Sequence, residues 1–288
     1  MKVKIKVLAS LALAIISVSW ASIIVLLSGA PGIICALWRL IFSSILTWIG
    51  ISINRDRLNL NKEVVLLTFI SGICLAMHFT FWMESLFMVP VAVSTTIVNL
   101  HPLISALISI LILKEKPRKI QLIGTVIAII GVALMTKASI KVKGEVGVIG
   151  LVYAFIGAIT VSIYFAIGRK LRRKMNTLPY TGMVYSWASI SLLPYTLIIQ
   201  LNIVNYEIKT WLAFIALAII PMMLGHTMLN YALKYLSLIA VTTVTLGEPI
   251  GATILASILL EQHITFDIAI AMIITLTGIL LTIMGEQK

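Results

Sequence analysis

One stretch of this sequence occurs twice, 147 residues apart, at residues 85–115 and 232–261. A repeat constrains the fold because each copy must build the same structural unit. Both copies lie in sequence apolar enough to cross a bilayer, so the repeat predicts a duplicated membrane protein. The matched positions are Leu86 with Leu233, Thr95-Thr96 with Thr242-Thr243, Pro102 with Pro249, and Gly131 with Gly278.

The composition excludes a water-soluble globular protein. Hydrophobic residues make up 60% of the chain and charged residues 11%, with a mean hydropathy of +1.11, whereas a soluble domain carries about 25% charged residues. The net charge is +12, but Lys and Arg lie in short runs between apolar segments. That distribution is typical of membrane topology rather than of a nucleic-acid-binding face, so we expect no nucleic-acid partner.

Apolar runs long enough to cross a bilayer, about 20 residues each, predict an all-α integral membrane protein with ten transmembrane helices. The first run, Val7 to Leu27, is longer than the ~7–15 residues of a signal-peptide core, so we expect it to span. The predicted spans are 7–28, 31–53, 63–84, 90–113, 120–137, 147–168, 180–201, 211–232, 238–260 and 266–284.

The basic residues predict the orientation of these spans. With the N-terminus in the cytoplasm, seventeen of the 22 Lys and Arg residues fall in cytoplasmic segments and four on the opposite side, while Arg39 lies inside the second span. Cytoplasmic loops carry the excess of positive charge in membrane proteins. We therefore expect a multi-pass protein of the plasma membrane with both termini in the cytoplasm.

The repeat divides the chain into two halves of five predicted spans, residues 1–137 and 138–288. An odd number of spans makes the second half begin on the opposite side of the membrane, so the two repeats are inverted. Inverted repeats around a midplane site are common in secondary transporters, because exchanging the conformations of the halves alternates access to the two sides. Channels and scramblases can share this plan.

Pro102 and Pro249 fall at the middle of the fourth and ninth predicted spans. Each proline deprives the carbonyl four residues earlier of its helical partner, and such freed groups must face protein, water or ligand. Directly before the prolines stand His101 and Glu248, at matching positions of the two copies. An ionisable residue at mid-membrane is costly, so both side chains are candidates for binding substrate or protons; a helix-to-helix hydrogen bond is the alternative.

Other polar residues of the spans complete the set of candidates. Arg39 lies too deep in the second span to reach the interface and needs an internal acceptor, for which Glu248 is one option. His78 and Trp82 are four apart on one helical face, and His226 and Asn230 repeat that spacing in the eighth span, which predicts a shared polar cavity or packing against neighbouring helices. Trp20 and Tyr164 could stack on a planar substrate or fill space.

Small residues form a stripe on the fifth and tenth spans, with Gly124 and Gly131 seven apart and Ala271 and Gly278 repeating the spacing. Small residues permit close helix approach, so the stripe predicts helix packing or a homodimer contact. Nucleotide-binding and hydrolase motifs are absent. Cys35 and Cys74 have neither disulfide nor metal-ligand spacing. We expect no cofactor, no metal and no enzymatic activity.

These motifs resemble the drug/metabolite transporter superfamily, specifically its EamA-type transporters, over nearly the whole chain. The resemblance implies ten spans in two inverted repeats and a carrier of small metabolites. It does not identify the substrate, and His101 departs from the small or hydroxyl residues usual before the first proline. The residues that carry it are Leu86, Pro102, Glu115, Gly124 and Gly131 in the first half, Ala232-Leu233, Pro249, Glu261 and Gly278 in the second, and Arg39 and Trp20.

The sequence therefore favours a secondary active transporter that exports small metabolites, with amino acids the favoured class, by alternating access. Glu248 and His101 would bind substrate or protons, Arg39 would attract a carboxylate, and aromatic residues would contact the apolar parts. Its partners would be the solute, the lipid bilayer and a coupled proton. The alternatives are an uncoupled facilitator of a solute or lipid, and a membrane scaffold that transports nothing.

Overall fold

The computed structural model describes residues 5–58, 60–137, 144–260 and 264–286, and these residues form helices with no strand among them. The predictions that involve Lys2, Lys4, Lys141, Lys143, Glu261 and Lys288 lie outside the described residues. The helical fold follows from the membrane, because a helix satisfies every backbone hydrogen bond within its own segment.

The helices follow one another with short connections. In chain order they are α1 (Ile5–Val18), α2 (Ala21–Leu27), α3 (Gly32–Asn54), α4 (Lys62–Ser85), α5 (Val91–Val98), α6 (His101–Leu111), α7 (Lys119–Lys137), α8 (Gly144–Arg172), α9 (Thr177–Ile198), α10 (Ile208–Leu217), the π-helix η1 (Ala218–His226), α11 (Thr227–Ala232), α12 (Leu238–Val244), the 3₁₀-helix η2 (Thr245–Gly247), α13 (Glu248–Leu260) and α14 (Phe266–Glu286).

Eight helices within the described residues are long and apolar enough to cross a membrane. They correspond to the first four, the sixth and the last three predicted spans. The other two predicted spans are helical as well, but α7 is apolar over a shorter length, Lys119–Met135, and α9 is not among the eight. The protein is thus a multi-pass helical membrane protein, and the count of ten spans stays a prediction.

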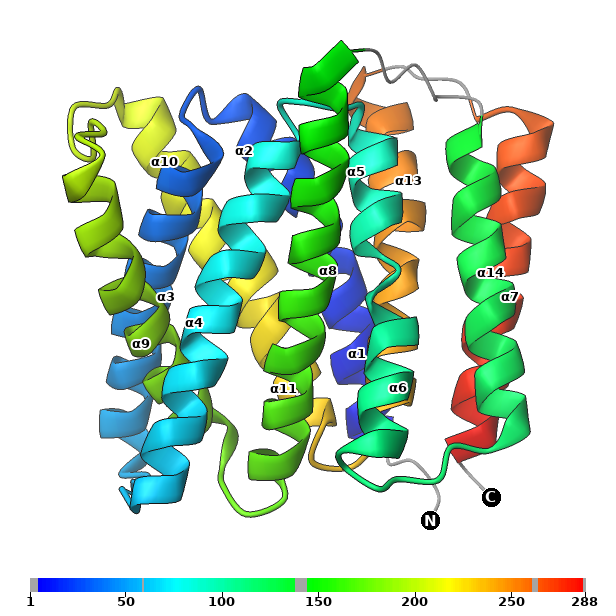
Figure 1. Ribbon diagram of the computed structural model, residues 1–288, viewed down its shortest axis with the longest axis horizontal. Coiled ribbons are helices and arrows are strands. Elements are labelled where there is room, and N and C mark those ends of the chain that lie inside the picture. The colour runs from blue at the N-terminus through cyan, green and yellow to red at the C-terminus, as the bar shows by residue number, and fades with distance from the viewer. Residues whose placement is uncertain (1–4, 59, 138–143, 261–263, 287–288) are drawn as a thin grey trace.

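The chain ends and most basic loops lie at one end of the bundle. Figure 1 shows the start of α1, the end of α14, and the α6–α7, α8–α9 and α11–α12 connections at the lower end. Arg55 at the end of α3, Lys116 after α6 and Arg169 near the end of α8 therefore share that end with the termini. We call it the terminal end of the bundle below.

Two predicted spans are broken at their central prolines. The fourth span divides into α5 and α6, with Asn99 and Leu100 between them and Pro102 in the first turn of α6. The ninth span divides into α12 and α13, which are joined by η2, and Pro249 is the second residue of α13. Both prolines thus stand directly after an interruption of their span, and a role for these breaks in function stays a prediction.

Two further interruptions were not predicted. The first span divides into α1 and α2 at Ser19-Trp20. In the eighth span nine residues around Pro221 widen into the π-helix η1, where the Thr227 N–H donates to the Met222 carbonyl, five residues earlier. Both segments pack against other helices of the bundle, although Ile219 and Leu224 of η1 are exposed.

The glycine stripe packs α7 against α14, which lie side by side in Figure 1. A side-chain carbon built on Gly131 would lie 2.6 Å from the Thr275 amide nitrogen, and one on Gly124 would lie 2.6 Å from the Gly278 carbonyl oxygen. Such distances are too short for any side chain, so the predicted helix packing is confirmed. A homodimer through another surface stays a prediction.

Replacing Gly278 by valine is therefore expected to force α7 and α14 apart, because a Cβ there collides with the backbone of Ala128. Overpacking of this kind costs roughly 1–3 kcal/mol. Thermal unfolding of the purified protein should show a lower Tm for Gly278→Val. The matched control is Thr277→Val on the exposed face of α14; equal Tm values for the two variants would contradict the packing described.

Candidate functional site

The four interruptions meet at one buried cavity of ≈ 30 Å³. Its wall includes Val18 and Ala21 beside the α1–α2 break, Val98 and Asn99 at the α5–α6 break, His226 at the end of η1, and Thr245 in η2. Interrupted helices at membrane depth are tolerated only where protein or a water-filled cavity covers them. The cavity is large enough for one or two water molecules.

The breaks of the first and ninth spans are in direct contact. The Ser19 hydroxyl lies 2.7 Å from the Ile15 carbonyl and 3.3 Å from the Glu248 carbonyl. The contact with Ile15 is a normal hydrogen bond to the residue four positions earlier, at the end of α1. The contact with Glu248 ties this segment to the start of α13. Glu248 is thereby held at the cavity by its backbone, while its side chain forms part of the cavity wall.

His101 bonds across to the second half of the chain. Its Nε2 lies 2.8 Å from Thr245 Oγ1, and that hydroxyl is 2.7 Å from the Thr242 carbonyl, to which it must donate. We therefore assign the proton to Nε2 of His101, so its Nδ1 carries a lone pair. Nδ1 is buried and has no hydrogen-bond partner among the described residues. No ion pair joins His101 to Glu248 within 4.0 Å among the described residues.

Arg39 is the most unusual residue of the site. Its side chain is 0% exposed, and none of its three guanidinium nitrogens has a hydrogen-bond partner in the described part of the chain. Its guanidinium carbon lies 4.0 Å from the centroid of the Phe79 ring, a cation–π contact. No ion pair joins Arg39 to Glu248 within 4.0 Å among the described residues, although both line the cavity.

His78 and Trp82 lie on the same face of α4 and both reach the cavity, as their spacing predicts. The rings stack, with centroids 5.9 Å apart and an angle of 3°. His78 Nδ1 lies 2.9 Å from the Gly157 carbonyl of α8 and must donate to it, which leaves a lone pair on Nε2. The Trp82 indole nitrogen has no acceptor within the described residues.

The π-helix places His226 against the same space. Its ring stacks on Phe165 at 5.9 Å and 6°, and lies 6.2 Å from His78. A wide turn of this type recurs at functional sites because it shifts the side chains that follow it. Of the predicted pair, only His226 lines the cavity. Asn230 is fully buried one turn further, where it donates to Tyr164 Oη and to the His226 carbonyl.

Of the nine predicted site residues, the structure brings six to the cavity: Arg39, His78, Trp82, His101, His226 and Glu248. Asn230 and Tyr164 form a second layer behind His226 and Phe165. Trp20 lies half-buried at the α1–α2 break and is not part of the wall. The two prolines shape the backbone and do not line the cavity.

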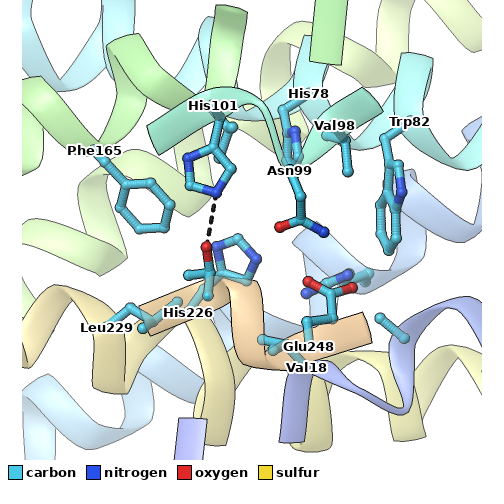
Figure 2. Close-up of a pocket in the computed structure, with 14 residues that line it drawn as sticks. Val18, His78, Trp82, Val98, Asn99, His101, Phe165, His226, Leu229 and Glu248 are labelled. Carbon is cyan, nitrogen blue, oxygen red and sulfur yellow. Dashed lines mark hydrogen bonds between the residues drawn. The ribbon is translucent and has the colours of Figure 1, made fainter. Parts of the chain in front are cut away.

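Eight residues of the wall were not among the predicted site residues, and three of these carry polar or aromatic side chains: Asn99, Phe165 and Thr245. Asn99 stands three residues before Pro102 and Thr245 four residues before Pro249, so a polar residue inside each interruption was the signal that could have found them. Figure 2 shows Asn99 and Glu248 facing the same space, with His101 on one side and Trp82 on the other. Nothing in the sequence indicated Phe165, because a single aromatic residue in an apolar span usually packs against neighbouring helices.

The wall combines groups of opposite character within a small space. Arg39 and the Trp82 indole supply unpaired donors. Glu248 is an acidic group, and the neutral imidazoles of His78 and His101 offer lone pairs. No three His, Cys, Asp or Glu side chains within the described residues are placed to hold a metal ion. Such a wall is suited to a small solute that carries both an acidic and a basic group.

Comparison with known proteins places the chain among transporters. It is 25% identical to an uncharacterized transporter of Clostridium kluyveri over 186 residues, which are 62% of this chain and 58% of that protein. It is 26% identical to the uncharacterized transporter YyaM of Bacillus subtilis over 171 residues, 55% of this chain and 56% of that one. The chain thus aligns with little more than half the length of these relatives.

A solved crystal structure has the same fold, with a TM-score of 0.79 at 18% identity over 98% of this chain and 99% of that one. The model of the EamA-like transporter family matches residues 5–137 and 148–284. Because these two segments make up most of the chain, the protein belongs to the EamA-like transporter family.

Proposed function

We propose that the protein is a secondary active transporter that exports small zwitterionic metabolites, with amino acids the favoured class. The observation that carries this proposal is the guanidinium of Arg39, which is fully buried at a cavity and has no hydrogen-bond acceptor among the described residues. The membership of a transporter family supports the general class. Family membership does not identify the substrate or the direction of transport, and both are part of what we propose.

The energetics of Arg39 favour a bound carboxylate. Burying an ion costs several kcal/mol after relaxation of the protein. A desolvated cation–π contact such as that with Phe79 returns about 2 kcal/mol. A carboxylate can accept two parallel hydrogen bonds from one guanidinium. Such a pair would offset the rest of the cost of burying the Arg39 charge. Glu248, in the same wall, would then receive the ammonium group of an amino acid.

Alternating access would use the broken helices as hinges. A cavity of ≈ 30 Å³ is too small for an amino acid, so the solute must enter through a rearrangement. We propose that the halves 1–137 and 138–288 are inverted repeats that rock about the interruptions at Pro102 and Pro249. The His101–Thr245 bond joins the two halves at that level and would have to break. Glu248 would exchange a proton when access changes.

A charged contact joins the two halves at the terminal end of the bundle. We define the terminal latch as Ser109, Glu115, Arg169, Arg173 and Leu238. Glu115 accepts from Arg169 Nε at 2.7 Å, Arg173 Nη2 at 2.6 Å, the Ser109 hydroxyl at 2.8 Å and the Leu238 amide at 3.2 Å. Ser109 and Glu115 belong to the first half and the other three to the second.

The opposite end is joined differently. There the Trp38 indole donates to the Ile203 carbonyl and the Thr210 hydroxyl to the Ser28 carbonyl, both at 2.7 Å. These are neutral hydrogen bonds, whereas all three ion pairs of the described residues lie at the terminal end. The basic loops at that end support our proposal that it faces the cytoplasm and that the membrane is the plasma membrane. We infer that the latch is the cytoplasmic barrier of the transport cycle.

Replacement of Arg39 by methionine tests the site. We expect at least a tenfold fall in amino-acid uptake into everted vesicles, because a hydrogen bond to a charged group contributes about 1.5–3 kcal/mol. The Tm should fall little or rise, since the guanidinium makes no protein hydrogen bond. Wild-type transport by Arg39→Met would refute the assignment.

Arg172→Met is the matched control, because this second buried arginine is bonded to the Asn230 and Met175 carbonyls and to Thr177. Its loss should lower the Tm.

Glu248→Gln tests proton coupling. The amide cannot exchange a proton, so we expect uptake into everted vesicles to lose its dependence on an imposed pH gradient. Asp267→Asn, at the exposed start of α14, is the control and should respond to the gradient as the wild type does. If wild-type flux follows only the solute gradient, the protein is an uncoupled facilitator.

Glu115→Gln is expected to open the latch. A reporter cysteine at Ser105 suits the test, because Ser105 is buried and lies on one face of α6 between His101 at the cavity and Ser109 at the latch. In a background with Cys35 and Cys74 replaced by alanine, an impermeant maleimide should label it in everted vesicles several-fold faster in the variant. An unchanged rate would show that Glu115 does not close this path.

Glu63→Gln is the control for that experiment, since the Glu63–Lys170 pair at the same end is exposed and contributes little.

The latch should also be insensitive to pH in the physiological range. Burial by itself would raise the pKa of Glu115, but the charge and hydrogen bond of Arg169, with those of Ser109 and Leu238, outweigh it and lower the pKa. A lowered carboxyl pKa contributes stability above its ordinary value of about 4.3, and that stability is lost as pH falls through the lowered value. The labelling rate of the wild-type reporter, divided by that of the unfolded protein at the same pH to remove the pH dependence of the thiolate fraction, should therefore be constant between pH 5 and 8.

A further inference from the structure

A second, larger cavity of ≈ 680 Å³ lies on the side of the bundle, and we call it the lateral groove. Its floor is one face of α4, and its walls come from Tyr153 of α8 and from Leu192 and Tyr195 of α9. Figure 1 shows α4 between these two helices. The groove lies outside the transport site, because His78 and Trp82 point from α4 to the central cavity and are not part of its lining.

The length of the groove matches one leaflet of a bilayer. Its lining residues on α4 run from Ile73 to Glu84, and the eleven steps between these two positions rise about 16 Å at 1.5 Å each. Half of a hydrocarbon core of about 30 Å is about 15 Å. Since α4 ends at Ser85, Glu84 lies at the membrane surface and Ile73 lies near the midplane.

The polar groups that α4 contributes to the groove lie near its surface end. Glu84 is the sole Asp, Glu, Lys or Arg in the lining among the described residues, and one of its carboxylate oxygens accepts from the Ile33 amide at 2.7 Å. One turn deeper, the buried Thr80 hydroxyl has no hydrogen-bond partner within the described residues. Below Thr80 the α4 floor is Ile73, Ala76 and Met77. The order from surface to midplane is therefore carboxylate, hydroxyl and apolar surface.

We propose that the lateral groove binds a phospholipid with a primary-amine headgroup. Its ammonium group would pair with Glu84, an ester carbonyl would accept from Thr80, and one acyl chain would lie along α4. Apolar contact alone cannot select a lipid, because lipid tails are as apolar as the groove. The selection comes from Glu84, which attracts a cationic amine and repels an anionic headgroup.

This selectivity is opposite to the one expected from the whole chain. A net charge of +12 attracts anionic lipids to the surface of the protein in general. The groove presents a carboxylate and no basic residue in its described lining. A preference for an amine headgroup would thus be the signature of this site, and it does not depend on which solute is transported.

The experiment is native mass spectrometry of the full chain released from vesicles of equal parts phosphatidylethanolamine and phosphatidylglycerol. We expect the wild type to retain one phosphatidylethanolamine in preference to phosphatidylglycerol. Glu84→Gln should lower that ratio about tenfold, the loss expected for one charged hydrogen bond. Its amide oxygen can still accept from Ile33, so the start of α3 is preserved. Thr80→Val should weaken retention of the lipid.

Glu207→Gln is the matched control, because Glu207 is an exposed carboxylate at the same end of the bundle, before α10. It should retain the preference of the wild type. Equal retention of the two lipids by the wild type would overturn the proposal, and so would an unchanged preference in Glu84→Gln.

Discussion

Backbone hydrogen bonding inside a membrane is the constraint on which this structure depends. A helix can be interrupted at mid-membrane only where protein, water or ligand accepts the freed groups. Four spans of this chain are interrupted or widened, and all four meet at one cavity. The rest of the molecule makes that convergence possible: α7 and α14 pack closely through glycine away from the cavity, and regular helices cover the broken ones.

The charged groups divide between two places with different roles. At the terminal end, Glu115 has a full set of donors and holds the two halves together. At the cavity, Arg39 has no acceptor and Glu248 has no ion-pair partner among the described residues. An ion pair with all its hydrogen bonds made stabilises one conformation. Charged groups without a partner at a cavity instead favour a solute of complementary charge. In the transport cycle that we propose, the latch and the small cavity would correspond to an occluded conformation.

The sequence predicted features that follow from one residue type at one position. The prolines of the repeat indicated where two spans are interrupted, and the depth of Arg39 and Glu248 in apolar spans indicated the candidate site. The break at Ser19-Trp20 has no proline or glycine, and it depends on the contact of Ser19 with Glu248 in another helix. The π-helix contains Pro221, a proline outside the repeat on which no prediction rested. Trp20 lies outside the cavity wall, and its position in the span did not reveal the direction of its side chain.

The central claim is that Arg39 and Glu248 together recognise a zwitterion. Thermal unfolding of the purified wild-type protein tests it directly, with a panel of amino acids each compared with its matched amine, which lacks the carboxylate, and its matched acid, which lacks the amine. A ligand at 100 times its Kd stabilises the folded state by about 2.7 kcal/mol. The account predicts a clear rise in Tm with at least one amino acid and a much smaller rise with its amine and its acid. An equal rise with the amine or the acid, or none with any amino acid, would contradict it.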